Sequence, residues 1–260
     1  MVITVSSIKG GVGKSSLVIL LANNLAARGH KILVIDMDLN NSLSLYYLSG
    51  VSGSKEKCEY QNILVALTQG GLEDNILDTR KPNIQIISSS LSLCNIRAID
   101  IHVFKRKLES LLKEIPYDYV LIDTSPTYDN IVMSALLAAD LIISPFTISE
   151  FNFNMSFFLM NQIREELPGQ AEKTFLLYNS WTDSIKSEES LQMQVKSFYD
   201  RSFSNIMKVK LPKTPFLDRY TNLDEPLCRN SPKTGNARLF NAVDELCNQI
   251  TGKIGEVSEF

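Results

Sequence analysis

The stretch SIKGGVGKSS, residues 7–16, decides the fold of this 260-residue chain. The letters GKS at 13–15 end the pattern G-x-x-x-x-G-K-[S/T], in which a glycine-rich loop surrounds phosphate groups. That pattern would place its first glycine at position 8, but Ile8 stands there and Lys9 follows it. The loop has therefore lost one glycine and gained a second cation.

The loop has the chemistry of a site for a nucleoside triphosphate. Its glycines allow the backbone to approach an anion closely, and backbone N–H groups at the start of the following helix point toward the phosphates. Lys14 is placed to bridge the terminal phosphates as a catalytic cation, and the Ser15 hydroxyl can bind Mg²⁺. The residues expected to contact the nucleotide are Lys9, Gly10, Gly11, Val12, Gly13, Lys14, Ser15 and Ser16.

Two later apolar runs end on an aspartate. A strand expected over 31–35 is followed by Asp36, and another over 119–122 is followed by Asp123. Ligands of parallel α/β sheets bind beyond the carboxyl ends of the strands, so both carboxylates should reach the crevice that holds the loop. Mg²⁺ keeps several waters and takes one or two carboxylates. Asp123 with Ser15 can therefore hold the ion, and Asp36 can order its water.

Asp38 is a candidate catalytic residue with two interpretations. It lies two residues after Asp36, so both carboxylates point the same way if the chain stays extended. Asp38 can then orient the water that attacks the terminal phosphate. In the second interpretation, Asp38 caps the helix that begins near Ser42.

Apolar runs alternate with segments of helical periodicity along the chain. This order indicates right-handed βαβ units and a doubly wound, mostly parallel α/β sheet flanked by helices. No linker or repeat divides residues 1–260, so we expect a single domain, with 49–83 polar and irregular apart from one short helix. The expected strands are 2–5, 31–35, 84–87, 119–122, 141–143, 174–178 and about 206–210. The expected helices are 15–28, 61–69, 101–114, 129–138, 153–166, 186–200 and about 234–250.

Composition excludes several classes of protein. Hydrophobic residues make up 44% and charged residues 21% of the chain, as in soluble globular domains. No apolar run approaches the roughly 18 residues of a membrane span, and the start of the chain lacks the basic flank of a signal peptide. The four cysteines show no metal-binding spacing. We therefore expect a cytoplasmic protein with reduced thiols.

Basic residues gather in the last third of the chain. The net charge is −3, but residues 196–238 hold nine Lys or Arg residues against four Asp or Glu residues. Such a segment is either a phosphate-binding face or an ordinary solvated surface, and its charge fits both interpretations.

Lys9 precedes the glycine loop, so its side chain is not committed to the nucleotide that its own loop holds. One possibility is that Lys9 reaches the phosphates held by a second subunit, where it would offset the charge that develops on the terminal phosphate. Two subunits would then enclose two ATP molecules, and hydrolysis would release the dimer. The other possibility is an ordinary exposed lysine, and the spacing fits both.

Three segments resemble the ParA/MinD family of P-loop ATPases. KGGVGKSS at 9–16 is similar to the deviant Walker A motif of that family, and VLIDTSP at 120–126 is similar to its Walker B and switch II segment. VIDMDLNNS at 34–42 is similar to its switch I. The resemblance implies that the ligands are ATP and Mg²⁺, and that Lys9 acts across an ATP-sandwich dimer.

The sequence departs from the family pattern at three positions. Switch I of the family usually reads D-x-D-P-Q, but Leu39 and Asn40 take the last two places here, and Ser125 replaces the first proline of switch II. These changes bear on the hydrolysis rate more than on nucleotide binding. By position, the resemblance also implies that Asn179 and Pro212 contact the adenine.

The resemblance favours the ParA branch of the family. The tail TGKIGEVSEF at 251–260 is acidic and interrupted by glycines, unlike the basic amphipathic helix with which MinD-like members bind membranes. The first expected strand starts at residue 2, which leaves no room for a preceding helix-turn-helix domain, so we expect DNA binding without sequence preference. Lys and Arg side chains give such binding through phosphate contacts. The candidate DNA contacts are Lys213, Arg219 and Arg229.

In this reading, the protein is a DNA-partitioning ATPase for a plasmid or chromosome. It would form an ATP-dependent homodimer, associate with the nucleoid, and hydrolyse ATP slowly until a ParB-like centromere-binding partner stimulates it. No membrane partner is expected. Two alternatives stay open: a MinD-like positioning ATPase that acts on a protein complex or membrane surface, and a nucleotide switch with weak hydrolysis.

Overall fold

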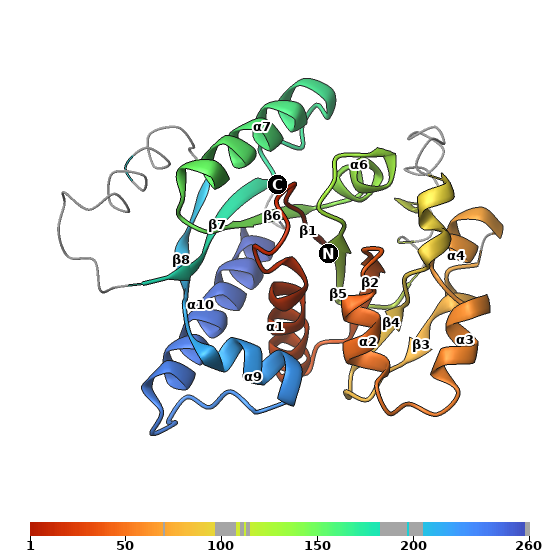
Figure 1. The fold of residues 1–260 in the computed structure, drawn as a ribbon, viewed down its shortest axis with the longest axis horizontal. Coiled ribbons are helices and arrows are strands. Elements are labelled where there is room, and N and C mark those ends of the chain that lie inside the picture. Colours follow the sequence, from red (N-terminus) through yellow and green to blue (C-terminus); the bar gives the residue numbers. More distant parts are fainter. Residues whose placement is uncertain are drawn as a thin grey trace.

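One eight-stranded sheet forms the centre of the computed structural model (Figure 1). The model describes residues 1–69, 71–96, 108, 109, 112, 115–182, 197 and 205–257. The strands are β1 (Val2–Val5), β2 (Ile32–Met37), β3 (Leu77–Asp78), β4 (Ile84–Ile87), β5 (Tyr119–Thr124), β6 (Leu141–Phe146), β7 (Thr174–Trp181) and β8 (Ile206–Pro212). Their order in the sheet is β3-β4-β2-β5-β1-β6-β7-β8. The edge strand β3 is antiparallel to β4, and the other described pairs are parallel.

Helices cover both faces of this sheet. They are α1 (Lys14–Ala27), α2 (Ser42–Leu48), α3 (Ser54–Tyr60), α4 (Ile63–Gln69), α6 (Asn130–Leu137), α7 (Glu150–Glu166), α9 (Pro215–Leu223) and α10 (Thr234–Val257), with short 3₁₀ turns at Glu73–Asn75 and Leu91–Ile96. In Figure 1, α1, α9 and α10 lie on one side of the sheet, and α6 and α7 lie on the other. None of the described helices is long and apolar enough to cross a membrane.

Successive side chains of a buried strand point alternately to the two layers of helices that cover the sheet. In β2, Ile32 and Val34 belong to the cluster that contains α1 and α10 side chains, whereas Leu33 and Ile35 belong to the cluster that contains α4 and α6 side chains. All six residues of β2 are buried, as are all six of β5. Continuous apolar runs are therefore required here, because a parallel sheet is covered on both faces.

The structure confirms the expected doubly wound, mostly parallel fold and corrects parts of the element assignment. The stretch 49–83 is not irregular, because it contains α3 and β3 as well as α4. Helix α10 continues to Val257, past the glycines where the sequence suggested a break. The expected helices 101–114 and 186–200 lie almost entirely outside the described residues.

Helix α9 was missed by the sequence analysis, although its start carries a recognisable signal. The Thr214 hydroxyl accepts a hydrogen bond from the Phe216 N–H, and Pro215 occupies the first turn. A capping threonine followed by proline favours a helix start, because proline lacks the N–H that would be unsatisfied there. This helix later proves to form one wall of the candidate site.

The strand register brings two carboxylates together at one edge of the sheet. Asp36 in β2 is the register partner of Asp123 in β5, and Asp123 is also the register partner of Val5, the last residue of β1. The glycine loop leaves β1 at this same edge. The fold therefore places three separated segments around one crevice, as the sequence predicted.

Candidate nucleotide-binding site

The glycine loop has a backbone that requires glycine at Gly11 and Gly13. Their φ angles are +74° and +89°, in the left-handed region that other residues rarely adopt. The Asn179 Nδ2 atom donates a hydrogen bond of 2.7 Å to the Val12 carbonyl oxygen, and a Cβ added to Gly13 would lie 2.4 Å from that nitrogen. Asn179 therefore supports the back of the loop.

Lys14 lies at the first turn of α1 and is 6% exposed. Burial lowers the pKa of its ammonium group, while the nearby carboxylates of Asp123 and Asp38 raise it. A cation held in this way between carboxylates and the loop is placed to bind phosphate groups.

Asp123 is fully buried at the end of β5 and receives a hydrogen bond of 2.6 Å from the Ser15 hydroxyl to its Oδ2 atom. Within the described part of the chain, its Oδ1 atom is buried and has no hydrogen-bond partner. Burial, followed by the charge of Asp36, raises the pKa of Asp123 to about 8.

The carboxyl group and hydroxyl at this point fit Mg²⁺. A buried oxygen without a partner needs a cation or a proton, and Mg²⁺ takes a carboxylate oxygen and a Ser or Thr hydroxyl while keeping waters. Asp123 and Ser15 would hold the ion. Bound there, Mg²⁺ would neutralise charge on the phosphate oxygens of a nucleotide.

Asp36 has a structural role that the sequence did not indicate. Its Oδ2 atom accepts hydrogen bonds from the Ser44 N–H at 2.9 Å and the Ser44 hydroxyl at 2.8 Å, and its Oδ1 atom accepts one from the Asp38 N–H at 3.1 Å. Burial raises its pKa to about 6, although these hydrogen bonds oppose the shift. Asp36, rather than Asp38, therefore satisfies an N–H of the first turn of α2. The capping interpretation of Asp38 was wrong.

Asp38 lines the cavity and is held by two of the three residues that depart from the family pattern. Its Oδ1 atom accepts hydrogen bonds from the Asn40 N–H at 3.0 Å and the Asn40 Nδ2 atom at 3.1 Å, and the Ser125 hydroxyl lies 3.4 Å away. The side chains of Asn40 and Ser125 thus converge on the candidate catalytic carboxylate.

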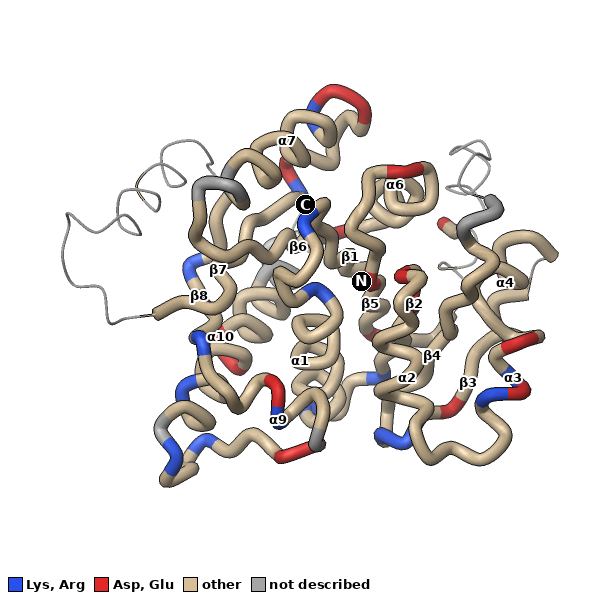
Figure 2. Tube along the Cα trace, viewed as in Figure 1, with Lys and Arg blue, Asp and Glu red and all other residues tan. Residues whose placement is uncertain are grey.

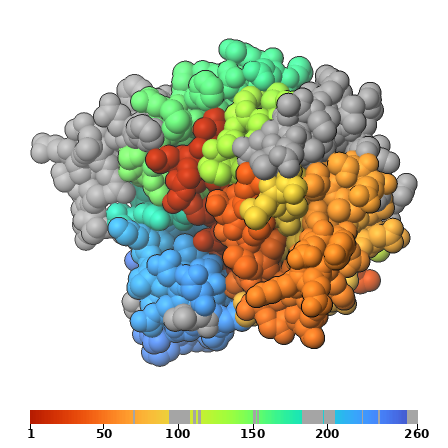
Figure 3. All heavy atoms as spheres, turned by 45° about the vertical axis from the view of Figure 1, so that its right-hand side comes forward, coloured from red at the N-terminus to blue at the C-terminus, as the bar shows by residue number. Residues whose placement is uncertain are grey.

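The glycine loop, Ser15 and Asp38 border a cavity of about 650 Å³, within the size range of ligand pockets, whereas Asp36 and Asp123 are not among its described lining residues. Figure 3 shows the red amino-terminal segment at the surface where the orange, green and blue segments meet. The floor of the cavity is the glycine loop with α1, one wall is α2 with Arg80, and the other wall is α9. Its described lining residues are Gly10, Gly11, Gly13, Lys14, Ser15, Ser16, Ile19, Asp38, Asn40, Ser42, Leu45, Tyr46, Ser49, Arg80, Pro126, Asp218, Thr221 and Asn222.

Sequence reasoning missed both walls of this cavity. Tyr46 and Arg80 belong to no phosphate-binding motif, and no helix was expected at α9. Conversely, four residues predicted to contact the nucleotide are not among the described lining residues: Lys9, Val12, Asn179 and Pro212. Asn179 contacts the loop from behind, Pro212 ends β8, and Lys9 lies half-buried at the entrance of the loop.

The three candidate DNA contacts lie on and around α9 and are not among the described lining residues of the cavity. Lys213 is exposed between β8 and α9. Arg219 pairs with Glu225 at 3.6 Å, and Arg229 pairs with Asp244 at 2.9 Å. Their side chains are still 48% and 64% exposed, respectively.

Comparison with known proteins identifies the family. The protein-family model described as AAA domain matches residues 1–167, more than half of the chain. The virulence plasmid ParA family protein pGP5-D of Chlamydia trachomatis is 29% identical over 254 residues, which cover 94% of this chain and 91% of that protein. The chain belongs to the ParA/MinD family of P-loop NTPases.

Solved structures of the ParA/MinD family share the fold. A plasmid partition protein from Borrelia burgdorferi bound to AMPPNP has a TM-score of 0.73 and 24% identity, covering 94% of this chain and 98% of that one. The septum site-determining protein MinD from Pyrococcus horikoshii, complexed with Mg-ADP, has a TM-score of 0.69 and 21% identity, covering 96% and 97%. Both confirm the fold class.

We predict that Gly13→Ala destabilises the nucleotide-free protein. The substitution forces a side chain into the left-handed region, which costs about 1–2 kcal/mol, and it displaces the Asn179 amide. At about 2–4 °C per kcal/mol, the melting temperature should fall by several degrees. Gly10→Ala is the matched control, because nothing lies within 4 Å of a Cβ at Gly10. Equal melting temperatures for the two variants in thermal unfolding would contradict the assignment.

We also predict that Asp123→Asn flattens the pH dependence of stability. The folded-state pKa of Asp123, about 8, lies above the usual 3.8. As the pH rises, the unfolded chain therefore loses this proton at a lower pH than the folded protein does. The wild type accordingly loses stability as the pH rises between these two values. Thermal unfolding in EDTA from about pH 5 to about pH 9 should show a smaller loss for the variant. Glu172→Gln removes an exposed carboxylate and should keep the wild-type slope; equal slopes for all three proteins would refute the prediction.

Proposed function

We propose that the protein is an ATP-dependent DNA-partitioning ATPase of the ParA type. The observation that carries this proposal is the presence, on one chain, of a cavity built for Mg-nucleotide and a basic carboxyl-terminal surface. Similarity to a plasmid ParA family protein over nearly the whole chain supports the same role. In the proposed cycle, ATP joins two subunits, the dimer binds DNA, and a ParB-like partner at a centromere stimulates hydrolysis and release.

We assign a different role in hydrolysis to each of these residues. Lys14 binds the phosphates from within the loop, and Asp38 orients the attacking water and accepts its proton. Arg80 lines the cavity, but its guanidinium is engaged by Asp224 and the Tyr46 carbonyl oxygen, so it does not act as an arginine finger within its own subunit. Lys9 supplies the missing charge to the partner subunit.

The basic surface surrounds α9. Figure 2 shows Lys and Arg along β8 and at the corner formed by α9 and the start of α10. Between residues 205 and 238 the described chain holds seven basic residues and three acidic ones. Exposed ion pairs such as Arg219–Glu225 contribute little to stability, so phosphate groups of DNA can compete for these side chains. The basic residues are Lys208, Lys210, Lys213, Arg219, Arg229, Lys233 and Arg238.

A nucleotide switch with weak hydrolysis is the second candidate. The hydrogen bonds from Asn40 to Asp38 favour it, because they occupy one oxygen of the carboxylate that must accept a proton. DNA binding distinguishes the main proposal from a positioning ATPase that acts on a protein complex or membrane. The DNA-binding prediction below tests this difference.

We predict that Lys9→Ala abolishes ATP-dependent dimerisation while sparing nucleotide binding by the monomer. Lys14→Ala should abolish nucleotide binding itself, because that lysine lies inside the loop. Calorimetry with AMPPNP and light scattering with and without AMPPNP separate the two effects. A Lys9→Ala protein that dimerises and hydrolyses ATP like the wild type would contradict the action across subunits.

We predict that Lys213→Glu and Arg219→Glu weaken ATP-dependent binding to non-specific DNA by about tenfold or more, since each reverses a charge that faces phosphate. Lys57→Glu on α3, at the opposite edge of the sheet, is the control and should bind DNA like the wild type. Fluorescence anisotropy at two salt concentrations measures the affinity. If the wild type hydrolyses ATP but does not bind DNA, the positioning ATPase or the switch replaces the main proposal.

A further inference from the structure

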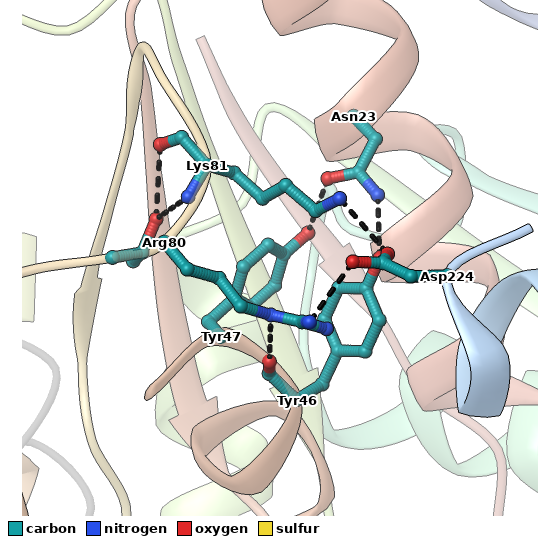
Figure 4. Close-up of polar contacts among 7 residues, drawn as sticks. Asn23, Tyr46, Tyr47, Arg80, Lys81 and Asp224 are labelled. Carbon is teal, nitrogen blue, oxygen red and sulfur yellow. Dashed lines mark hydrogen bonds and ion pairs between the residues drawn. The ribbon is translucent and has the colours of Figure 1, made fainter. Parts of the chain in front are cut away.

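A polar cluster outside the phosphate loop joins four elements that are distant in sequence. Figure 4 shows Asp224, directly after α9, facing Tyr46 of α2 and the pair Arg80 and Lys81 from the turn between β3 and β4. Asn23 of α1 lies beside the same tyrosine. No motif in the sequence indicated this cluster.

Asp224 is the centre of the cluster. Its Oδ1 atom accepts a hydrogen bond of 2.9 Å from the Tyr46 hydroxyl and lies 2.8 Å from the Lys81 Nζ atom. Its Oδ2 atom accepts a hydrogen bond of 2.9 Å from the Arg80 Nη1 atom. Three donors from two other segments therefore meet on one carboxylate.

The donors are themselves fixed. The Arg80 Nε atom donates to the Tyr46 carbonyl oxygen at 2.8 Å, and its guanidinium carbon lies 4.5 Å from the centre of the Tyr46 ring. The Asn23 Nδ2 atom donates to the Tyr46 hydroxyl at 3.1 Å, and the Tyr47 hydroxyl donates to the Asn23 Oδ1 atom at 3.2 Å. The cluster is thus a connected network, not a single surface ion pair.

The network joins the two walls of the nucleotide cavity. Tyr46 and Arg80 line that cavity from the α2 side, and Asp218, Thr221 and Asn222 line it from α9. Asp224 directly follows α9 and bonds to Tyr46 and Arg80, two of the lining residues of the opposite wall. The distance between the walls therefore depends on this carboxylate.

We propose that Asp224 is a positioning residue for the nucleotide, which holds α9 against α2 and so sets the width of the cavity. The inference rests on the proposed nucleotide-binding function of this cavity. Asp224 does not line the cavity and acts through α9, Tyr46 and Arg80.

Two features show that the side chain, rather than the backbone alone, is required at this position. Asp224 has a φ of +57°, which glycine adopts at lower cost, so the backbone does not explain an aspartate here. Although partial burial opposes ionisation, hydrogen bonds from Lys81 and Tyr46 and the charges of Lys81 and Arg80 lower the pKa of Asp224. The carboxylate is thus charged at neutral pH.

Asp224→Asn tests the proposal with little change in shape, since asparagine tolerates the left-handed region. We expect its affinity for AMPPNP to fall by about tenfold, with a raised KM for ATP and an unchanged kcat. Tyr46→Phe removes one donor and keeps the ring, and should weaken AMPPNP binding in the same direction. Glu225→Gln is the matched control: it removes the adjacent carboxylate, which pairs with Arg219 and Lys233 instead of α2, and should keep the wild-type affinity.

The outcomes separate this inference from the proposed function. Weaker binding by Asp224→Asn and Tyr46→Phe, with unchanged kcat and with faster hydrogen exchange in α9, supports the positioning role. Wild-type affinity in both variants overturns it, as does an equal loss in Glu225→Gln. If Asp224→Asn does not fold, Tyr46→Phe alone decides by the same criteria. A wild-type protein that binds no AMPPNP refutes the proposed function instead.

Discussion

The constraint on which the structure depends is the burial of two neighbouring carboxyl groups at one edge of a parallel sheet. The register of β2 and β5 makes Asp36 and Asp123 partners, and both are fully buried. Burial disfavours the charged form of both groups and raises both pKa values, and the charge of Asp36 raises the pKa of Asp123 further. Their presence points to a ligand that brings positive charge.

The two carboxyl groups meet this constraint in different ways. Asp36 accepts hydrogen bonds from Ser44 and Asp38, so it binds the start of α2 to the end of β2. Asp123 receives only the Ser15 hydroxyl among the described residues and keeps one oxygen without a partner. The first carboxylate organises the wall of the cavity, and the second is available to Mg²⁺. Both carboxyl groups lie at the same edge of the sheet. Asp36 bonds to Ser44 of α2, and the same helix carries Tyr46 of the Asp224 network.

The floor of the site could be predicted from local sequence motifs, whereas its walls are formed by contacts between segments that are distant in sequence. The loop at 7–16 is recognisable in the sequence because its glycines permit the required backbone conformation and its lysines are placed to bind a ligand. Strand ends at Asp36 and Asp123 follow from continuous apolar runs. By contrast, Tyr46 and Asp224 are 178 residues apart in sequence, and no local pattern pairs them. The capping of α2 by Asp36 instead of Asp38 also depended on the path of the chain after β2, which spacing alone does not determine.

The role of Asp123 in the site implies that its carboxyl group, whose pKa burial raises in the free protein, releases a proton when Mg-nucleotide binds. Calorimetry of Mg-AMPPNP binding near neutral pH, in two buffers of different ionisation enthalpy, measures this directly. We expect proton release on binding, because a metal-bound carboxylate must be ionised, and much weaker nucleotide binding in EDTA. Binding without proton release, at the same affinity in EDTA, would contradict it.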